Sequence, residues 1–212
     1  MNSPRSAAES ARTAALGPWR ELRSGVYVAV AEPESVNLGL IVGAHRTLLI
    51  DTGSSPEQGR EIRDSVTAVT DRPLAAVVVT HWHYDHAFGL AAFGDVPRIA
   101  HETVHTRLSS ADASSDAQRL GVDSSDLGRP TQEIAVATAI DLGDRRVEIA
   151  HLGSGHTDGD LVVVIPDADV LFAGDLIESA GPPSFGSDSV PDEWPATVDA
   201  VIGLMTATTL AV

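Results

Sequence analysis

The sequence contains no cysteine and no lysine. Its 212 residues carry 14 basic side chains, all of them arginine, against 30 Asp and Glu, and the formal net charge is −16. The absence of cysteine excludes disulfides and thiolate ligands, so a bound metal ion would need His, Asp, Glu or other oxygen donors. The acidic balance argues against binding to a nucleic acid or to an anionic membrane surface.

Long hydrophobic runs are also missing. The first twenty residues, MNSPRSAAESARTAALGPWR, have no continuous apolar segment like that of a secretory signal. No window of about 18 apolar residues indicates a membrane span. We therefore expect a cytoplasmic protein with a flexible N-terminal tail over residues 1–17 and one domain over residues 18–212.

Short apolar runs separated by Gly, Pro and charged residues predict many strands. The expected strands are 25–31, 37–43, 46–51, 73–80, 96–100, 133–138, 145–152, 160–166 and 169–175. Helical spacing of apolar residues predicts helices over 55–69 and 191–207. Residues 109–131 are rich in Ser and Asp with weak periodicity, and we interpret them as a mobile surface segment. Strands with helices outside them predict an α+β fold in which two sheets pack face to face.

The stretch VTHWHYDHA (79–87) begins with the last two residues of the apolar run 73–80. It places four groups able to bind a metal, His81, His83, Asp85 and His86, within six positions. In an extended chain alternate residues share a face, so His81 and His83 can point at one ion. Asp85 and His86 follow where the chain turns toward a helix, and can reach a second ion nearby. Imidazole and carboxylate ligands suit zinc, iron or manganese.

Three more candidates come from distant parts of the chain. His156 lies in the glycine-rich stretch HLGSGHTDGD, Asp175 ends the apolar run VLFAGD, and Asp51 follows the apolar run TLLI in TLLIDTG. Polar residues at the ends of neighbouring strands can converge at one edge of a sandwich, so we expect them to join the cluster. The remaining histidines, His45, His101, His105 and His151, are expected to be surface or structural residues.

The motif THWHYDH, with DTG before it and GHTDGD and FAGD after it, resembles the metallo-β-lactamase superfamily, in particular its thioesterase-like and glyoxalase-like branch. The resemblance implies a four-layer αββα sandwich with two zinc ions at one edge. By the family pattern, His81, His83 and His156 bind the first ion, and Asp85 and His86 serve the second. Asp175 bridges the two ions, and Asp51 fixes the geometry of the motif loop behind them.

One feature departs from that pattern. Family members usually supply a further histidine to the second ion from a loop after a later strand, whereas this sequence has no histidine after His156. We expect either that the fold is incomplete at its C-terminus, or that the second ion is held more weakly by Asp85, His86 and Asp175 alone.

The resemblance implies a metal-dependent hydrolase that acts on a small molecule. A metal-activated hydroxide would attack an ester, thioester, lactone or amide carbonyl, and Asp85 would act as the catalytic carboxylate that orients or accepts the proton. Phe185 and Trp194 are candidates for apolar contact with the substrate, because they lie in a Pro-, Gly- and Ser-rich stretch after Asp175.

Two alternatives remain open. The first is a persulfide dioxygenase-like oxidoreductase with a single iron ion, held by His81, His156 and Asp175. The second is an inactive or truncated metal-binding domain.

Overall fold

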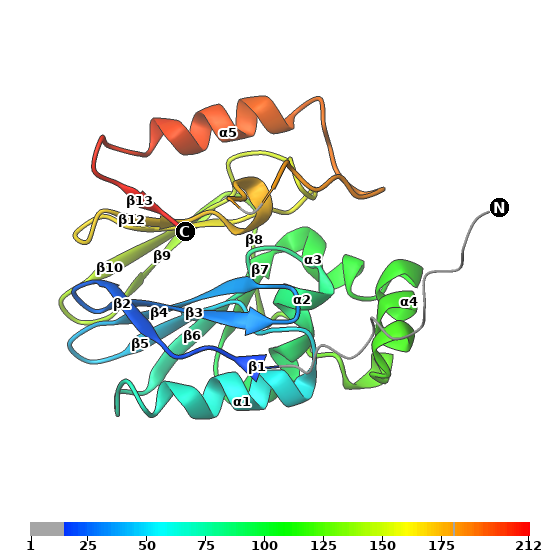
Figure 1. Ribbon diagram of the computed structural model, residues 1–212, viewed down its shortest axis with the longest axis horizontal. Coiled ribbons are helices and arrows are strands. Elements are labelled where there is room, and N and C mark those ends of the chain that lie inside the picture. Colours follow the sequence, from blue (N-terminus) through cyan, green and yellow to red (C-terminus); the bar gives the residue numbers. More distant parts are fainter. Residues whose placement is uncertain (1–14, 180) are drawn as a thin grey trace.

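The computed structural model describes residues 15–179 and 181–212 (Figure 1). The strands are β1 (Ala15–Leu16), β2 (Arg20–Arg23), β3 (Val26–Glu32), β4 (Val36–Val42), β5 (Thr47–Ile50), β6 (Leu74–Val78), β7 (Arg98–His101), β8 (Gln132–Ile134), β9 (Ala137–Asp141), β10 (Arg146–Ala150), β11 (Val162–Ile165), β12 (Val170–Phe172) and β13 (Leu210–Ala211). The α-helices are α1 (Pro56–Val66), α2 (Tyr84–Ala87), α3 (Glu102–Arg107), α4 (Ala111–Leu120) and α5 (Trp194–Gly203), with short 3₁₀ turns η1 (Phe88–Phe93), η2 (Ser124–Asp126) and η3 (Gly174–Leu176). No helix in these residues is long and apolar enough to cross a membrane.

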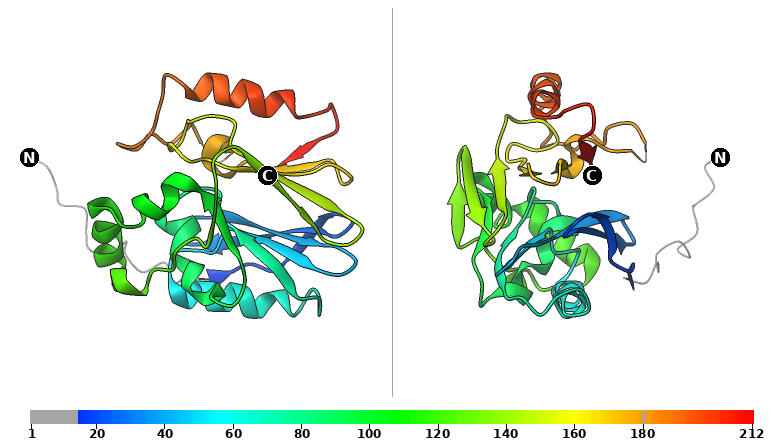
Figure 2. Two further views of the ribbon diagram at one scale, coloured as in Figure 1. Left: turned by 180° about the vertical axis from the view of Figure 1, so that it is seen from behind. Right: turned by 90° about the vertical axis from the view of Figure 1, so that its left-hand side faces the viewer.

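Two sheets form the centre of the molecule. The first has eight strands in the order β1-β3-β4-β5-β6-β7-β8, with β2 paired to β3, and the second has five in the order β13-β12-β11-β10-β9. Helix α1 lies under the first sheet and α5 over the second, so that the sheets are enclosed between helices (Figures 1 and 2). The predicted four-layer αββα sandwich is confirmed.

The core is divided into three apolar layers, as four stacked layers require. Strand β6 shows how the sequence produces them. Its neighbours Val77 and Val78 are both fully buried, but Val77 packs toward the helices and Val78 packs between the sheets. Successive side chains of a strand point to opposite faces, so a strand covered on both faces needs a continuous apolar run. The third layer joins the second sheet to α5 through Leu171 and Trp194.

The predicted N-terminal tail needs a correction at its end. Residues 1–14 lie outside the described part of the chain, but Ala15 and Leu16 pair with β3, and the Gly17 amide donates to the Val30 carbonyl at 2.8 Å. The apolar Leu16 side chain packs against the layer beneath the first sheet, which gives this pairing its driving force.

The predicted mobile segment 109–131 is also wrong, because it contains helix α4. Ser110 caps the helix by accepting from the Ala113 amide, and Gly121 ends it in the left-handed conformation with φ of 71°. Its buried contacts are made by Ala113 and Ala117. Alanine gives a weak hydrophobic signal, which explains why the periodicity of the sequence missed this helix.

Strand ends bring the chemical groups together. Asp51 follows β5, His81 comes three residues after β6, and Asp175 comes three residues after β12. His156 lies in the loop that joins β10 to β11. Both sheets therefore contribute residues to one edge of the sandwich, which is the arrangement expected from the sequence.

Candidate metal centre

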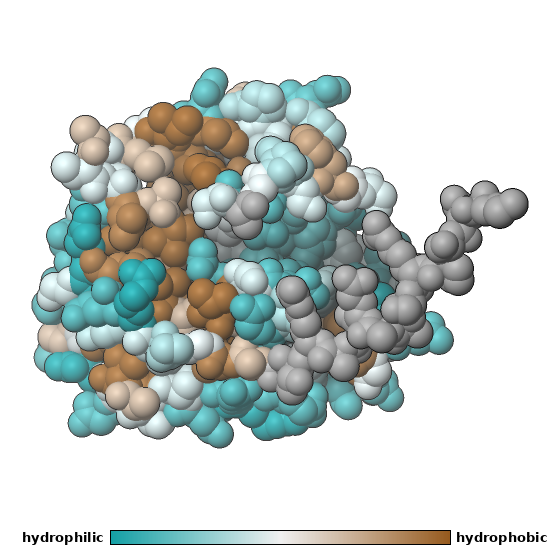
Figure 3. Space-filling view, viewed as in Figure 1, coloured by the Kyte–Doolittle hydropathy of each residue, from teal (hydrophilic) through white to brown (hydrophobic). Residues whose placement is uncertain are grey.

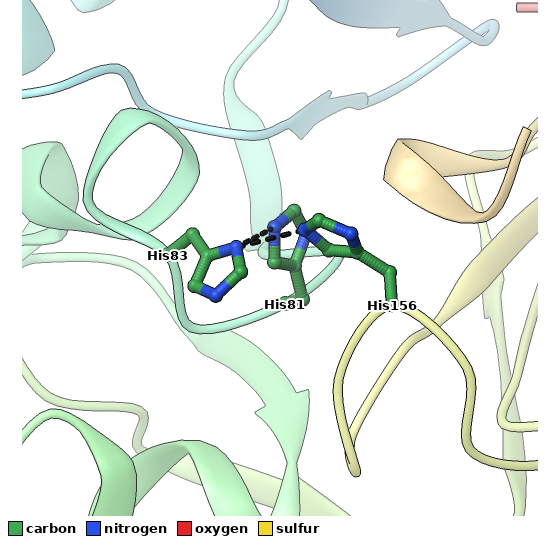
Figure 4. Close-up of side chains that lie close together, drawn as sticks. All are labelled: His81, His83 and His156. Carbon is green, nitrogen blue, oxygen red and sulfur yellow. Dashed lines mark hydrogen bonds between the residues drawn. The ribbon is translucent and has the colours of Figure 1, made fainter. Parts of the chain in front are cut away.

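Three histidines from the two sheets converge on one point. Nδ1 of His83 lies 3.1 Å from Nε2 of His81 and 2.8 Å from Nε2 of His156 (Figure 4). The His81 and His156 side chains are almost fully buried, and His83 is one-fifth exposed. The predicted first group of ligands is therefore assembled, although its members are 75 positions apart in the sequence.

This convergence fits a cation better than it fits hydrogen bonds among the rings. A neutral imidazole has one N–H and one lone pair, so three nitrogens that face one point cannot all be satisfied by one another. The outward nitrogens have partners of their own. Nδ1 of His156 lies 3.1 Å from the Ser184 carbonyl, and Nδ1 of His81 lies 3.2 Å from the Thr80 hydroxyl. Protons on the outward nitrogens leave the lone pairs pointing inward, as a metal site requires.

A second group lies beside the first and includes His86 and Asp175. Nε2 of His86 lies 3.3 Å from Oδ1 of Asp175 and 3.7 Å from Oδ2 of Asp85. This nitrogen is buried and makes no hydrogen bond with any described residue. It faces two carboxylates at ion-pair distance, so these three side chains are placed to hold a cation between them.

Asp175 lies between the two groups. Its Oδ2 atom is 3.5 Å from Nε2 of His156 and 3.9 Å from Nε2 of His81, while Oδ1 faces His86. Gly174, the residue before it, has φ of 54°, and a Cβ there would lie 2.9 Å from Cβ of Thr80. Gly174 of the FAGD motif adopts a backbone conformation that other residues rarely take, and a larger side chain there would clash with Thr80. This glycine therefore sets the direction of the Asp175 side chain.

Asp51 supports the cluster from behind. Its carboxylate accepts from the amide and hydroxyl of Thr80 and lies 2.8 Å from Nδ1 of His86. Asp51 has φ of 63°, an unusual conformation for a non-glycine residue. A strained position that survives with several hydrogen bonds is typical of functional sites. Its place matches the supporting role that the resemblance implies.

Electrostatics keep the nitrogens of His81 and His156 in the first group neutral and the carboxylate of Asp175 charged. Burial, with the neighbouring histidines, holds the pKa of His81 well below its usual value, and burial lowers the pKa of His156 to about 4. Burial alone would raise the pKa of Asp175, but the nearby His86 and the other histidines lower it to about 2. Neutral imidazoles and ionised carboxylates are the forms that bind metals. In the second group burial opposes protonation of His86, but the carboxylates of Asp51, Asp175 and Asp85 raise the pKa of its ring well above the usual value, so this ring must release a proton before it can bind a metal.

Asp188 is a site residue that the sequence analysis did not single out. It accepts from Nε1 of Trp82 at 2.7 Å and lies 3.1 Å from Nε2 of His83, and its side chain is 8% exposed. Interaction with His83 lowers the pKa of Asp188 to about 2 against the opposing effect of burial. Nothing in the sequence around Asp188 distinguishes it from the other acidic residues of 181–194, because its role depends on a contact across 105 positions.

The two predicted substrate residues have different surroundings. Phe185 is 61% exposed and lines the cleft beside the histidines. Trp194 is 5% exposed, donates to the Leu176 carbonyl and packs in the layer under α5. Trp194 is therefore a core residue whose ring approaches His156 at 5.6 Å between centroids, and it does not line the cleft as predicted.

The four histidines expected to be structural lie outside both groups. The rings of His101 and His151 stack at 4.2 Å between centroids, and His105 pairs with Glu133 at 3.3 Å. Among the described residues, neither these nor His45 join three groups able to hold a metal.

Two cavities open onto the cluster. One, of about 480 Å³, is bordered by His83, His156 and Asp175 together with Phe185 and Asp188. The other, of about 430 Å³, is bordered by His86 and Asp51 and by apolar residues of β12 and β13. Apolar surface gathers over β13 and α5 in Figure 3, where Ile202 and Leu204 are about half exposed. We refer to the first cavity, which is bordered by His83 and His156 of the first group, as the histidine cleft.

Comparison with known proteins gives the same picture. Residues 31–209 match the metallo-beta-lactamase superfamily. The chain is 24% identical over 187 residues to the metallo-beta-lactamase type 2 of Bacillus sp. (strain 170), covering 87% of this chain and 67% of that protein. It is 32% identical over 168 residues to the acyl-coenzyme A thioesterase MBLAC2 of Bos taurus, covering 66% and 58%.

The fold also matches solved structures. A metallo-beta-lactamase from Pontibacter korlensis superposes with a TM-score of 0.74 at 22% identity, covering 92% of this chain and 88% of that one. This likeness concerns the fold, whereas the sequence match extends over most of the chain. The chain belongs to the metallo-β-lactamase superfamily, and it is a hydrolase of the metallo-β-lactamase fold with a His/Asp metal site.

Proposed function

We propose that this protein is a zinc-dependent hydrolase that cleaves a small ester, thioester, lactone or amide in the histidine cleft. The observation that carries the proposal is the convergence of three histidine nitrogens from two sheets beside a second group with an unpaired buried nitrogen. In this proposal His81, His83 and His156 hold the first ion, while Asp85 and His86 hold the second. Asp175 contacts both ions.

The donor set supports zinc. Three imidazoles with one open direction form the usual arrangement of catalytic zinc, and no thiolate is needed. When bound, the ions would lower the pKa of coordinated water to about 7 and polarise a carbonyl oxygen. Iron and manganese accept the same ligands, so metal analysis must decide between them.

Asp85 is suited to handle a proton in this reaction. It borders both cavities next to the metal groups, so a substrate or water molecule in either cavity can contact it. Burial raises the pKa of Asp85 although the nearby His86 opposes the shift. A carboxylate with a raised pKa is a better proton acceptor than an exposed one. We therefore assign Asp85 the role of orienting water and accepting its proton.

The branch of the superfamily is part of the proposal. The aspartate between the two groups supports the thioesterase-like and glyoxalase-like branch, as does the likeness to an acyl-coenzyme A thioesterase. Most of the similar proteins named above are metallo-beta-lactamases, which cleave the amide of a lactam ring as their name states. The panel of substrates must therefore include β-lactams, thioesters and lactones.

A single-iron oxidoreductase is the second candidate. Oδ2 of Asp175 lies within 3.9 Å of Nε2 of both His81 and His156, so two nitrogens and one carboxylate oxygen are available for a facial iron triad. The position of His83 favours zinc hydrolysis, because its Nδ1 atom is closer to both other histidines than Asp175 is.

The test begins with purified protein stripped of metal and reloaded separately with zinc, iron or manganese. We expect up to two zinc ions per chain and hydrolysis of at least one substrate class, lost on chelation and restored by zinc. Oxygen consumption with glutathione persulfide by the iron-loaded form, without hydrolysis by the zinc-loaded form, would support the second candidate. Failure to bind any of the three metals would refute both.

A further inference from the structure

We propose that the histidine cleft selects substrates that carry a positive charge, such as an ammonium group near the carbonyl to be cleaved. This inference rests on the proposed hydrolysis and names its substrate class. It concerns the wall of the cleft and not the metal ligands. Figure 3 shows the region as a hydrophilic hollow to the right of the centre, between α4 and the segment after Asp175.

Features of the cleft other than its charge also indicate a binding site. His83 and His156, two of the three histidines that converge, border it, and Nε2 of His86 lies next to Asp85 and Asp175, which both border it. The volume of about 480 Å³ is suitable for a small molecule. The remaining question is which chemical class of small molecule its walls favour.

Acidic side chains dominate those walls. The carboxylates that border the cleft are Glu34, Asp85, Asp112, Asp116, Asp175 and Asp188. Among the residues that the structure describes, no arginine borders it, and the chain has no lysine. An anionic substrate would therefore meet no basic side chain in the described part of the cleft.

Four of these six carboxylates already have partners in the protein. Asp85 and Asp175 belong to the second metal group, and Asp188 is held by Trp82 and His83. Asp116 pairs with Arg119 at 3.2 Å.

Glu34 and Asp112 are different. Neither forms a salt bridge in the described part of the chain. The charge of Asp112 interacts with the Arg107 guanidinium, which pairs directly with Asp158, and Glu34 interacts with the Tyr84 side chain. Glu34 lies in the turn between β3 and β4, and Asp112 lies in the first turn of α4. These two carboxylates face the same cleft from different elements and add negative charge to its wall beyond that of the carboxylates in the metal groups.

Aromatic groups add a second attraction for a cation. The guanidinium carbon of Arg119 lies 4.7 Å from the centre of the Tyr84 ring, so one aromatic residue of the wall already holds a cation of the protein itself. Phe185 presents an exposed ring across the cleft. Clefts lined by one sign of charge concentrate the field and favour opposite charge, while aromatic faces attract cations.

The test compares two thioesters of the same shape with zinc-loaded full-length protein. Acetylthiocholine carries a quaternary ammonium, and S-(3,3-dimethylbutyl) thioacetate replaces it with a neutral tert-butyl group. We expect kcat/KM to be about tenfold higher for the cation at low salt, and the ratio to fall as NaCl is added. In parallel, calorimetry compares the binding of choline with that of its neutral analogue, 3,3-dimethylbutan-1-ol. This binding measurement does not depend on hydrolysis.

A pair of variants links the preference to the wall. The double variant Glu34→Gln/Asp112→Asn should reduce the ratio at least about threefold. The matched control Glu61→Gln/Asp71→Asn removes the same charge from exposed positions outside the cleft and should keep the ratio of the original protein.

A ratio of one or below, or a ratio that both double variants change equally, would overturn the inference. Tighter binding of choline without hydrolysis of any thioester, lactone or β-lactam would support charge selection and refute the proposed function. Hydrolysis of both thioesters at equal rates would support the proposed function and refute charge selection.

Discussion

At the residue scale, each histidine of the first group is oriented by a contact on its outward nitrogen. His81 faces Thr80, His83 faces Asp188, and His156 faces the Ser184 carbonyl. These contacts fix which ring nitrogen carries the proton, and so which one is free to bind a metal. Of the three contacts, the one from Asp188 is made by a carboxylate, and it can be removed without changing the size of the side chain.

We predict that Asp188→Asn weakens the first metal site. The amide keeps the volume of the carboxylate but loses its charge, so His83 is held less firmly and is a weaker ligand. Zinc affinity should fall by about 10–100-fold, measured by competition with a chromophoric chelator. Asp192→Asn, an exposed change in the same segment, is the control and should bind zinc normally. Equal affinities for the two variants would contradict the role of Asp188.

A second prediction concerns Asp160, which accepts from the amide and hydroxyl of Thr157 and so holds the loop of His156. Burial raises the pKa of Asp160 to about 7, against an unfolded value near 4. Between these values the folded state binds the extra proton, so the stabilising effect of this group is lost as pH rises from about 4 to about 7.

Asp160→Asn lacks this titration. We compare the free energies of unfolding of the original protein and the variant, both without metal. The original value minus the variant value should therefore fall as pH rises from about 4 to about 7 and level off above that. Urea denaturation at a series of pH values measures it, and the exposed Asp71→Asn should follow the original protein. A difference that rises with pH would show that the shift has the opposite sign.

At the scale of elements, the site is built where strands end and loops begin. The loop after Asp175 shows this best, because its contacts converge on the ligands. The Ser189 hydroxyl donates to the His156 carbonyl at 2.8 Å, and the Val190 amide donates to the Gly155 carbonyl at 2.9 Å. Together with Asp188, these bonds fasten one exposed loop to histidines from both sheets. Helix α4 borders the opposite wall of the histidine cleft.

The end of α4 provides a test at this scale. Gly121 has φ of 71°, and a Cβ atom added there would meet no neighbouring atom within 4 Å, so its backbone conformation alone restricts substitution. Gly121→Val should destabilise the protein by about 1–2 kcal/mol, and Gly121→Asn by clearly less, because Asn tolerates the left-handed region. Urea unfolding measures both. Equal stability of the two variants would mean that the helix does not end as described.

At the scale of the whole molecule, the metal centre ties the two sheets together. His81 and His83 follow the first sheet, whereas His156 and Asp175 belong to the second. An ion bound between them contacts both halves of the sandwich, and it binds only when both are folded. Binding to the folded state alone must raise the stability of the entire domain.

We therefore predict that zinc raises the melting temperature and that a chelator lowers it. At a free zinc concentration about 100 times the dissociation constant, the added stability is about 2.7 kcal/mol. His83→Ala should lose most of this gain, whereas His105→Ala, which lies outside both groups, should retain it. Differential scanning calorimetry measures the effect. A melting temperature that does not respond to zinc would argue against a site shared by the two sheets.

The sequence by itself determined the layers and most of the ligands. Continuous apolar runs fix strands that are buried on both faces, as Val77 and Val78 show, and four donors within six residues identify a metal motif whatever the surroundings. These features are local, so a pattern along the chain records them. Helix α4 escaped this kind of prediction because its buried residues are alanines.

Only the tertiary structure decided which further residues surround the site. Asp188 joined it, and Trp194 moved into the core, because each position depends on contacts between residues far apart in the chain. The acidic wall of the histidine cleft has the same origin. Glu34 and Asp112 are ordinary surface carboxylates in the sequence, and they act on one cavity only because folding places a turn and a helix on either side of it.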